Sequence, residues 1–215
     1  MSTLVSTVMM TTLVIGPFYL SLGLGLKMSI IGLTLSIGPL VSALAGVPAG
    51  RMVDRFGGQR MTAIGLVGIA IGATLLSILP ASFRVPGYIA PIIVITASYA
   101  LFQAATNTVI MTGISADERG VVSGILSLSR NLGLLTGASV MGAVFALASG
   151  AIDFTTARPE AVASGMRITF AVAALLGVVA LGIAIGSSAI VKRHSLQFGF
   201  LWLCWLLAGT SNLFT

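Results

Sequence analysis

Apolar stretches separated by short charged segments dominate this chain and restrict the folds that it can adopt. A helix needs about 20 consecutive apolar residues to cross the hydrocarbon core of a bilayer. Each stretch reaches that length, and only the fifth contains a charged residue. The pattern therefore predicts six transmembrane helices, at approximately 4–26, 29–50, 61–80, 88–114, 120–149 and 168–191.

The composition excludes a water-soluble globule. Charged residues make up 7% of the chain, against about 25% in ordinary soluble domains. Hydrophobic residues make up 57% and the mean hydropathy is +1.10, so too few polar side chains remain to cover a soluble surface. We expect an all-α protein that is integral to the lipid bilayer of the plasma membrane (the inner membrane in a Gram-negative bacterium), with one six-span domain over residues 1–194.

The tail at residues 195–215 differs from the segments before it. Its apolar part, 198–209, is too short to cross a bilayer. One interpretation is an interfacial segment with Trp202 and Trp205 near the lipid headgroups. The other is an aberrant end left by truncation or a frameshift.

Several function classes are excluded by the charges and by the rare residue types. The formal net charge is +6, but the basic residues are scattered along the chain, which does not predict nucleic-acid binding. With Cys204 as the single cysteine and His194 as the single histidine, we expect no metal site and no cofactor. No span holds a carboxylate pair or a nucleophile beside a base, so an enzyme is not expected.

The basic residues also predict an orientation. An even number of spans puts both ends of the chain on one side of the membrane. If both ends are cytoplasmic, six basic residues lie in cytoplasmic loops and four in outside loops. Because cytoplasmic loops carry an excess of Lys and Arg, this count favours cytoplasmic ends.

The segment after the second span reads GRMVDRFGGQR, residues 50–60. It resembles the signature loop of the major facilitator superfamily, which joins two helices on the cytoplasmic side; an ordinary charged turn is the alternative. A glycine there lets two helices approach, and an aspartate suits the positive end of a neighbouring helix. The residues that match the signature are Gly50, Asp54, Arg55, Gly57 and Arg60.

Two later segments extend the resemblance. ALFQAATNTVIM (100–111) and residues 118–146 are similar to the tenth and eleventh spans of drug-efflux members of that superfamily. The resemblance implies the carboxyl-terminal half of a twelve-span transporter, whose substrate path lies between two six-helix halves. It further implies efflux of small organic molecules or drugs by proton antiport and alternating access. The alternatives are efflux of sugars or other metabolites, and a nonconducting half that assembles with another transporter.

A stripe of polar residues follows the fourth span at helical spacing. Such a stripe avoids lipid, so it either packs against another helix or lines a wet cavity, and the resemblance favours the cavity. Its members are Thr96, Tyr99, Gln103, Thr106 and Asn107.

Arg130 lies about 15 Å along the fifth span, counted from Gly120, which predicts a position near the middle of the membrane. A charge at that depth marks function by default, although snorkelling or a structural hydrogen bond would also explain it. No carboxylate lies at depth in a span, so the amides of Gln103 and Asn107 are its candidate partners. The coupling carboxylate of an antiporter is then expected in the other half. The expected substrate-path residues are Tyr19, Phe102, Gln103, Asn107 and Arg130.

Glycines recur at four-residue spacing inside the spans, as small residues do where membrane helices pack closely. The pairs are Gly46 and Gly50, Gly68 and Gly72, Gly133 and Gly137, and Gly182 and Gly186.

Overall fold

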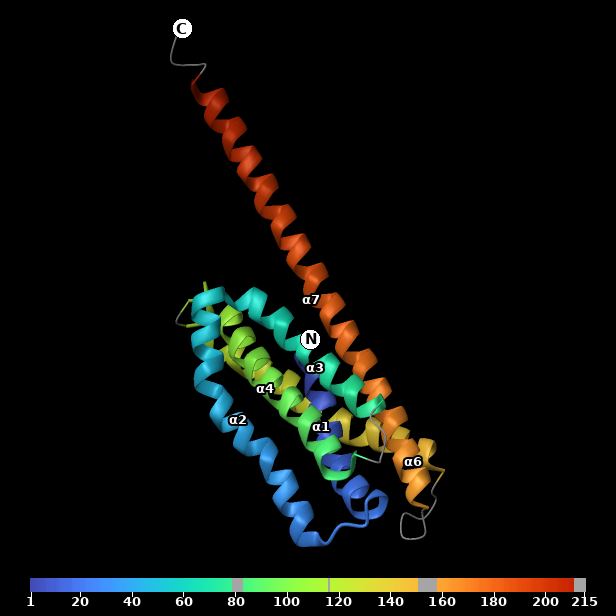
Figure 1. Cartoon of the computed structure of the whole chain (residues 1–215). Helices are drawn as coiled ribbons and strands as arrows, with labels where there is room; N and C mark the ends of the chain where they lie inside the picture. Colours follow the sequence, from blue (N-terminus) through green and yellow to red (C-terminus); the bar gives the residue numbers. More distant parts are fainter. Residues whose placement is uncertain (79–82, 116, 151–157, 211–215) are drawn as a thin grey trace.

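The computed structural model describes residues 1–78, 83–115, 117–150 and 158–210, with side chains in these ranges except for those of 187–210. Within these ranges the regular elements are all helices, and no strand occurs (Figure 1). They are α1 (Ser2–Phe18), η1 (Tyr19–Gly23), α2 (Met28–Phe56), α3 (Gly58–Ile78), α4 (Arg84–Met111), α5 (Arg119–Thr136), η3 (Gly137–Met141), α6 (Gly142–Ser149) and α7 (Pro159–Thr210), where η marks a π-helical turn.

The predicted six-span, all-helical fold is confirmed for the described residues. Helices satisfy their own backbone hydrogen bonds, which is what a bilayer without water requires of a crossing segment. Six helical segments are long and apolar enough to span, and their positions agree with the predicted series. They are Ser2–Gly23, Met28–Phe56, Gly58–Ile78, Arg84–Met111, Arg119–Ser149 and Pro159–Gly186.

The boundaries differ from the prediction at two places. α2 continues to Phe56 through most of the segment that we expected to be a polar loop, and it ends only because Gly57 adopts a φ of +88°. α7 begins at Pro159, about two turns before the expected start. Proline suits the first helical position, since the N–H that it lacks would be unpaired there, and Glu160 in the first turn suits the helix dipole.

The backbone of α7 continues to Thr210 and so includes most of the predicted tail. The last five residues, 211–215, lie outside the described ranges, as does Asp153 in the loop before α7. The interfacial placement of the tail stays a prediction.

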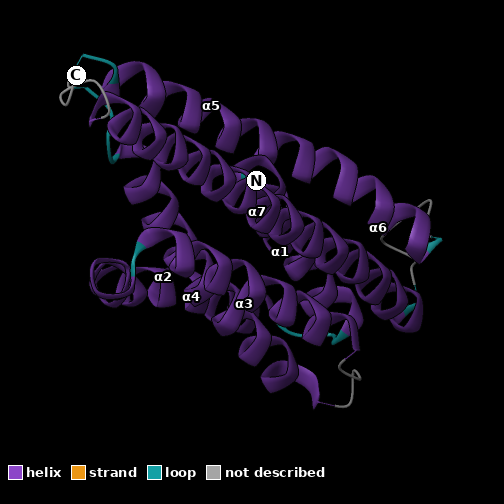
Figure 2. Cartoon of the chain, turned by 90° about the horizontal axis from the view of Figure 1, so that it is seen from above, coloured by secondary structure: helices purple, strands orange, loops and turns teal. Residues whose placement is uncertain are grey.

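The helices form two groups with α1 and α7 between them. Seen from above, α2, α3 and α4 lie on one side of α1 and α7, while α5 lies on the other (Figure 2). The contacts between helices agree with this view, because α3 packs on α4 and α7, and α1 packs on α5 and α7. The shared core consists of apolar side chains from α1, α3, α4 and α7, among them Ile15, Leu66, Ile69, Ile95 and Phe170.

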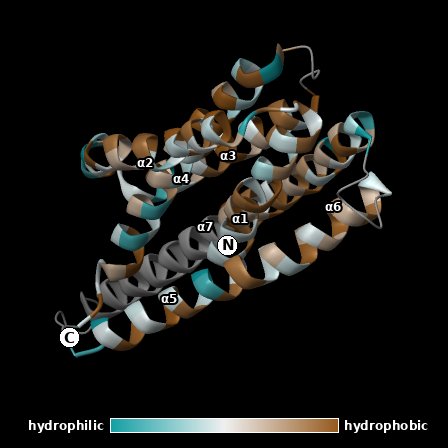
Figure 3. Ribbon diagram, turned by 90° about the horizontal axis from the view of Figure 1, so that it is seen from below, coloured by the Kyte–Doolittle hydropathy of each residue, from teal (hydrophilic) through white to brown (hydrophobic). Residues whose placement is uncertain are grey.

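Hydrophobic residues recur along the helices (Figure 3), and many of their side chains lie on the outside of the bundle. Leu33, Leu44 and Val47 of α2 are each more than 60% exposed, as are Val121 and Leu135 of α5. In water such a surface would be a liability, whereas in a bilayer the lipid tails cover it. The chain is an integral membrane protein.

Close packing through glycine is confirmed for two of the predicted pairs. A Cβ added at Gly72 of α3 would lie 2.5 Å from the side chain of Ile95, and one at Gly133 would collide with the carbonyl oxygen of Thr3. Around Gly46 and Gly182, by contrast, no described atom lies within 4 Å of the added Cβ. These two glycines therefore bring no helices together within the described part of the chain.

Candidate functional site

A cavity of about 210 Å³ lies between α1, α2 and α4. We call it the hydroxyl cavity, because each of its polar side chains carries a hydroxyl group and none carries a charge. Its lining consists of Met9, Thr12, Leu13, Thr34, Leu35, Gly38, Pro39, Ser42, Tyr88, Ile92, Thr96 and Tyr99.

Some of the hydroxyl groups are already bonded to nearby backbone. Thr12 donates to the carbonyl oxygen of Met9 at 2.7 Å, and Thr34 donates to that of Ile30 at 2.8 Å. The hydroxyl groups of Thr96 and Tyr99, by contrast, make no hydrogen bond to the described residues, although Thr96 is only 5% exposed. Two hydroxyl groups on α4 are therefore available to a guest molecule.

Tyr88 connects the hydroxyl cavity to the end of α1. Its hydroxyl lies 3.5 Å from the carbonyl oxygen of Thr12, and its ring packs against that of Tyr19 with 6.1 Å between centroids. Gly16 makes this approach feasible, because any Cβ at that position would collide with the Tyr88 hydroxyl. Tyr19 itself begins the π-helical turn that follows Pro17, a residue without an N–H for the helical ladder.

The predicted substrate-path residues of α4 lie on different faces of the helix. Phe102 is 3% exposed and belongs to the core beside α3, whereas Gln103 is half-buried and Asn107 is exposed. The expected polar stripe is divided between two cavities, since Thr96 lines the hydroxyl cavity and Thr106 lines a second one.

Arg130 is half-buried on α5, and its guanidinium makes no hydrogen bond or ion pair with the described residues. The preceding residue, Ser129, accepts a hydrogen bond of 3.1 Å through its carbonyl oxygen from Thr3, in the first turn of α1. Arg130 is therefore level with the start of α1. Its predicted position near the middle of the membrane stays a prediction. Neither Gln103 nor Asn107 bonds to it.

The segment that resembles the signature loop lies where α2 meets α3. The N–H of Gly57 donates to the carbonyl oxygen of Val53 at 2.9 Å, and its positive φ turns the chain into α3. The guanidinium of Arg55 lies 5.4 Å from the centre of the Phe56 ring. Asp54 and Arg60 are exposed, so charged groups gather at this end of the bundle.

The close helix approach at this segment depends on Gly58 rather than on Gly50. A Cβ at Gly58 would lie 2.5 Å from the Val109 side chain and 3.1 Å from the carbonyl oxygen of Ala105, so α3 starts in tight contact with α4. Nothing described lies within 4 Å of a Cβ at Gly50. The spacing of the motif did not show which of its glycines lies in close contact with a neighbouring helix.

Four residues of the hydroxyl cavity were missed by sequence reasoning. They are hydroxyl residues scattered over largely apolar spans, and they do not form a polar stripe at helical spacing. The only available signal was that hydroxyl groups recur on three different spans. The four are Thr12, Thr34, Ser42 and Tyr88.

The described acidic residues lie at helix ends. Asp54 is near the end of α2, Asp117 and Glu118 precede α5, and Glu160 is in the first turn of α7. Among the residues with described side chains, no three His, Cys, Asp or Glu residues come together as metal ligands would.

The lining of the hydroxyl cavity combines aromatic rings with hydroxyl groups. It is therefore suited to binding an uncharged or weakly polar group, by contact with the rings and by hydrogen bonds.

Known transporters resemble this chain over part of its length. The Major Facilitator Superfamily profile matches residues 1–138. An "Uncharacterized transporter YebQ" from Escherichia coli K12 is 34% identical over 125 residues, which cover 58% of this chain and 27% of that protein. A "Multidrug efflux pump LfrA" from Mycolicibacterium smegmatis is 27% identical over 127 residues, which cover 59% of this chain and 25% of the pump. The matched segments thus span only about a quarter of these relatives.

Proposed function

The chain belongs to the major facilitator superfamily, and we propose that it takes part in the efflux of small organic molecules, drugs among them, by proton antiport and alternating access. Its family is one of transporters rather than enzymes. The relative named a multidrug efflux pump supports the efflux part of the proposal.

The hydroxyl cavity is the observation that carries the proposal. Aromatic rings and apolar side chains contact varied organic groups without strict geometry, and hydroxyl groups act as donors or acceptors. Because no charged side chain lines the cavity, no particular charge is demanded of the guest. Pockets for drug-sized molecules usually measure about 300–1,000 Å³, so a cavity of about 210 Å³ would hold one part of such a molecule.

A second six-helix half would enclose the rest of the substrate. We propose that residues 1–194 form one half of the transporter, with the substrate path between the halves. The uncovered apolar side chains of α2 and α5 offer surfaces for that partner.

The proton-coupling carboxylate is assigned to the partner half. Proton relays inside membranes generally use titratable groups at depth, whereas the described carboxylates of this chain lie at helix ends. The contribution of this chain would be substrate contacts, for which we retain Tyr19, Phe102, Gln103, Asn107 and Arg130 together with the residues of the hydroxyl cavity.

We place the protein in the plasma membrane, the inner membrane in a Gram-negative host, with both ends in the cytoplasm. The α2–α3 junction would then face the cytoplasm, where the exposed Arg55 and Arg60 agree with the excess of basic residues on that side.

Arg130 favours a second candidate function, the efflux of anionic metabolites. A guanidinium without a partner among the described residues has its donors available for a carboxylate or a phosphate. Anionic metabolites would then be the substrates in place of cationic drugs.

Dye accumulation in the host cell tests the proposal. Deleting the coding region should raise ethidium accumulation, wild-type complementation should reverse this rise, and a protonophore should remove the difference. Complementation with Thr96→Val should restore efflux only partly, whereas the exposed Thr108 provides the matched control, Thr108→Val. Unchanged accumulation of cationic dyes and of anionic metabolites after deletion would indicate a nonconducting half.

A further inference from the structure

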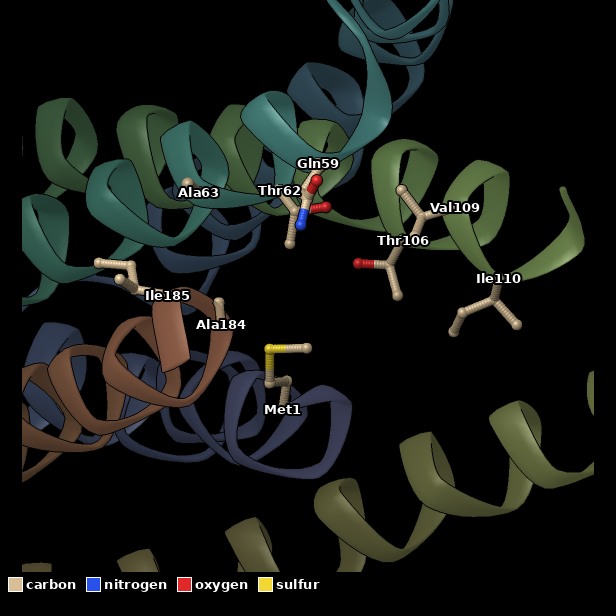
Figure 4. Close-up of a pocket in the computed structure, with 9 residues that line it drawn as sticks. All are labelled: Met1, Gln59, Thr62, Ala63, Thr106, Val109, Ile110, Ala184 and Ile185. Atoms are coloured by element: carbon tan, nitrogen blue, oxygen red, sulfur yellow. The ribbon is translucent and has the colours of Figure 1, made fainter. Parts of the chain in front are cut away.

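A second cavity, of about 140 Å³, lies between the start of α3, the end of α4, the start of α1 and α7. We call it the Thr106 cavity. Its polar residues are Gln59, Thr62 and Thr106, and the rest of the lining is apolar: Met1, Ala63, Val109, Ile110, Ala184 and Ile185. Figure 4 shows side chains from these helices arranged around a common space.

The hydroxyl of Thr106 is the distinctive feature of this cavity. Thr106 is 7% exposed, and its Oγ1 has no hydrogen-bond partner in the described structure. Many other threonines of the spans donate to the carbonyl four residues earlier, as Thr108 does to Ala104 at 3.0 Å on the same helix. Thr106 instead points its hydroxyl into the cavity (Figure 4). A buried hydroxyl without a partner costs free energy, so a bound guest that supplies one is favoured.

A second oxygen on the same wall is able to accept a hydrogen bond. Thr62 donates its hydroxyl hydrogen to the carbonyl oxygen of Gly58 at 2.9 Å, which leaves the lone pairs of its Oγ1 for a donor in the cavity. The Gln59 amide lies beside Thr62 at the rim, where the residue is exposed (Figure 4). Polar groups are thus gathered at the walls formed by α3 and α4.

We propose that the Thr106 cavity binds a small uncharged molecule that has an apolar ring and one hydroxyl group, such as a phenol. The guest hydroxyl accepts from Thr106 and donates to Thr62, and the ring contacts Val109, Ile110 and Ala184. The proposed guest is neutral, because no charged side chain is found among the described residues that line the cavity and burying an unpaired ion costs free energy.

The volume agrees with this class of guest. An engineered apolar cavity of about 150 Å³ in another protein binds benzene, and the Thr106 cavity is of similar size. The site is distinct from the hydroxyl cavity, with which it shares no lining residue. The proposal therefore does not depend on the proposed transport function.

Fluorine NMR of the full chain in lipid nanodiscs tests the proposal, with 4-fluorophenol and fluorobenzene as the two probes. Both should bind saturably. Thr106→Val preserves the shape but removes the donor, so it should weaken fluorophenol binding about fivefold, the size of one net hydrogen bond, and leave fluorobenzene unchanged. Thr106→Ser should keep the wild-type preference. Thr108→Val, on the same helix, should change neither affinity.

Ala63→Leu fills the cavity and should abolish the saturable binding of both probes, which separates binding in the site from partition into lipid. If the wild-type chain binds no more of either probe than Ala63→Leu does, the cavity holds only water or lipid and the proposal is wrong. Equal loss of both probes in Thr106→Val and Thr106→Ser would also overturn it, since the hydroxyl would then not be what recognises the guest.

Discussion

The hydroxyl oxygen of Thr7 lies 3.0 Å from the carbonyl oxygen of Gly133 and so joins α1 to α5. It is also 3.0 Å from the carbonyl oxygen of Thr3 in its own helix, and its single hydrogen is shared between the two acceptors. The contact exists because Gly133 has no side chain, since a Cβ there would meet the backbone of α1. α5, which carries Arg130, is held against the bundle at this point.

Gly133→Ala should destabilise the protein by about 1–3 kcal/mol, the usual cost of overpacking a close contact. The obstacle is the backbone oxygen of Thr3, which no side-chain rotation removes. The measurement is thermal unfolding in detergent. Gly124→Ala is the matched control on α5, because nothing described lies within 4 Å of that Cβ. Equal unfolding temperatures for the two variants would contradict the observed packing.

Thr7→Val should cost less, about 0.6 kcal/mol, which is the average for a hydrogen bond between membrane helices. The loss is small because the Gly133 carbonyl keeps a backbone partner, the N–H of Gly137. Unfolding of Thr7→Val and of the double variant with Gly133→Ala measures the coupling between the two positions. Strictly additive losses would show that the two residues do not interact.

The chain alone should show no vectorial transport, because we propose that one half supplies only one wall of the substrate path. The assay is efflux of a cationic dye from proteoliposomes under a pH gradient, with empty liposomes as the control. Robust gradient-driven efflux by this chain alone would rule out the half-transporter proposal.

Single cysteines test the proposed orientation after Cys204→Ser. Met28→Cys, before α2, should react with an impermeant thiol reagent in intact cells, whereas Asp117→Cys, before α5, should react only after the cells are opened. Both positions are exposed, so a difference in labelling reports the side of the membrane. The reverse pattern would place both ends of the chain outside.

Arg130→Lys should reduce transport in the full transporter more than Arg119→Lys, the matched change at the exposed start of α5. A planar guanidinium contacts several oxygens at once, and an ammonium does not reproduce that geometry. Arg130→Ala should lose more activity still. Transport per molecule and unfolding temperature are measured together, because a purely structural arginine would lower both. Normal transport per molecule in Arg130→Ala would remove this residue from the substrate path.

The polar residues of α4 show how far sequence reasoning reached into the candidate site. Periodicity placed Thr96, Tyr99 and Thr106 on one stripe. In the structure, Thr96 and Tyr99 line the hydroxyl cavity, whereas Thr106 lines the Thr106 cavity. A helical pattern fixes which residues share a face. It does not fix which neighbouring helices meet that face, so Tyr88 was missed.

The surroundings of Arg130 show the same limit. Rise per residue fixes distance along one helix, but it does not fix which helix lies beside a given turn. The hydrogen bond from Thr3 to the carbonyl oxygen of Ser129 puts this turn of α5 beside α1, and no property of α5 alone predicts that neighbour.

The sequence by itself determined the six apolar helices and the family, because hydrophobic length and the motif at residues 50–60 are local properties of the chain. The tertiary structure decided that Gly58 rather than Gly50 lies against a neighbouring helix, and that the hydroxyl of Thr106 opens into a cavity. These outcomes depend on which helices pack side by side. In a bilayer that choice rests on close van der Waals contact and a few hydrogen bonds, since apolar residues face lipid and protein about equally well.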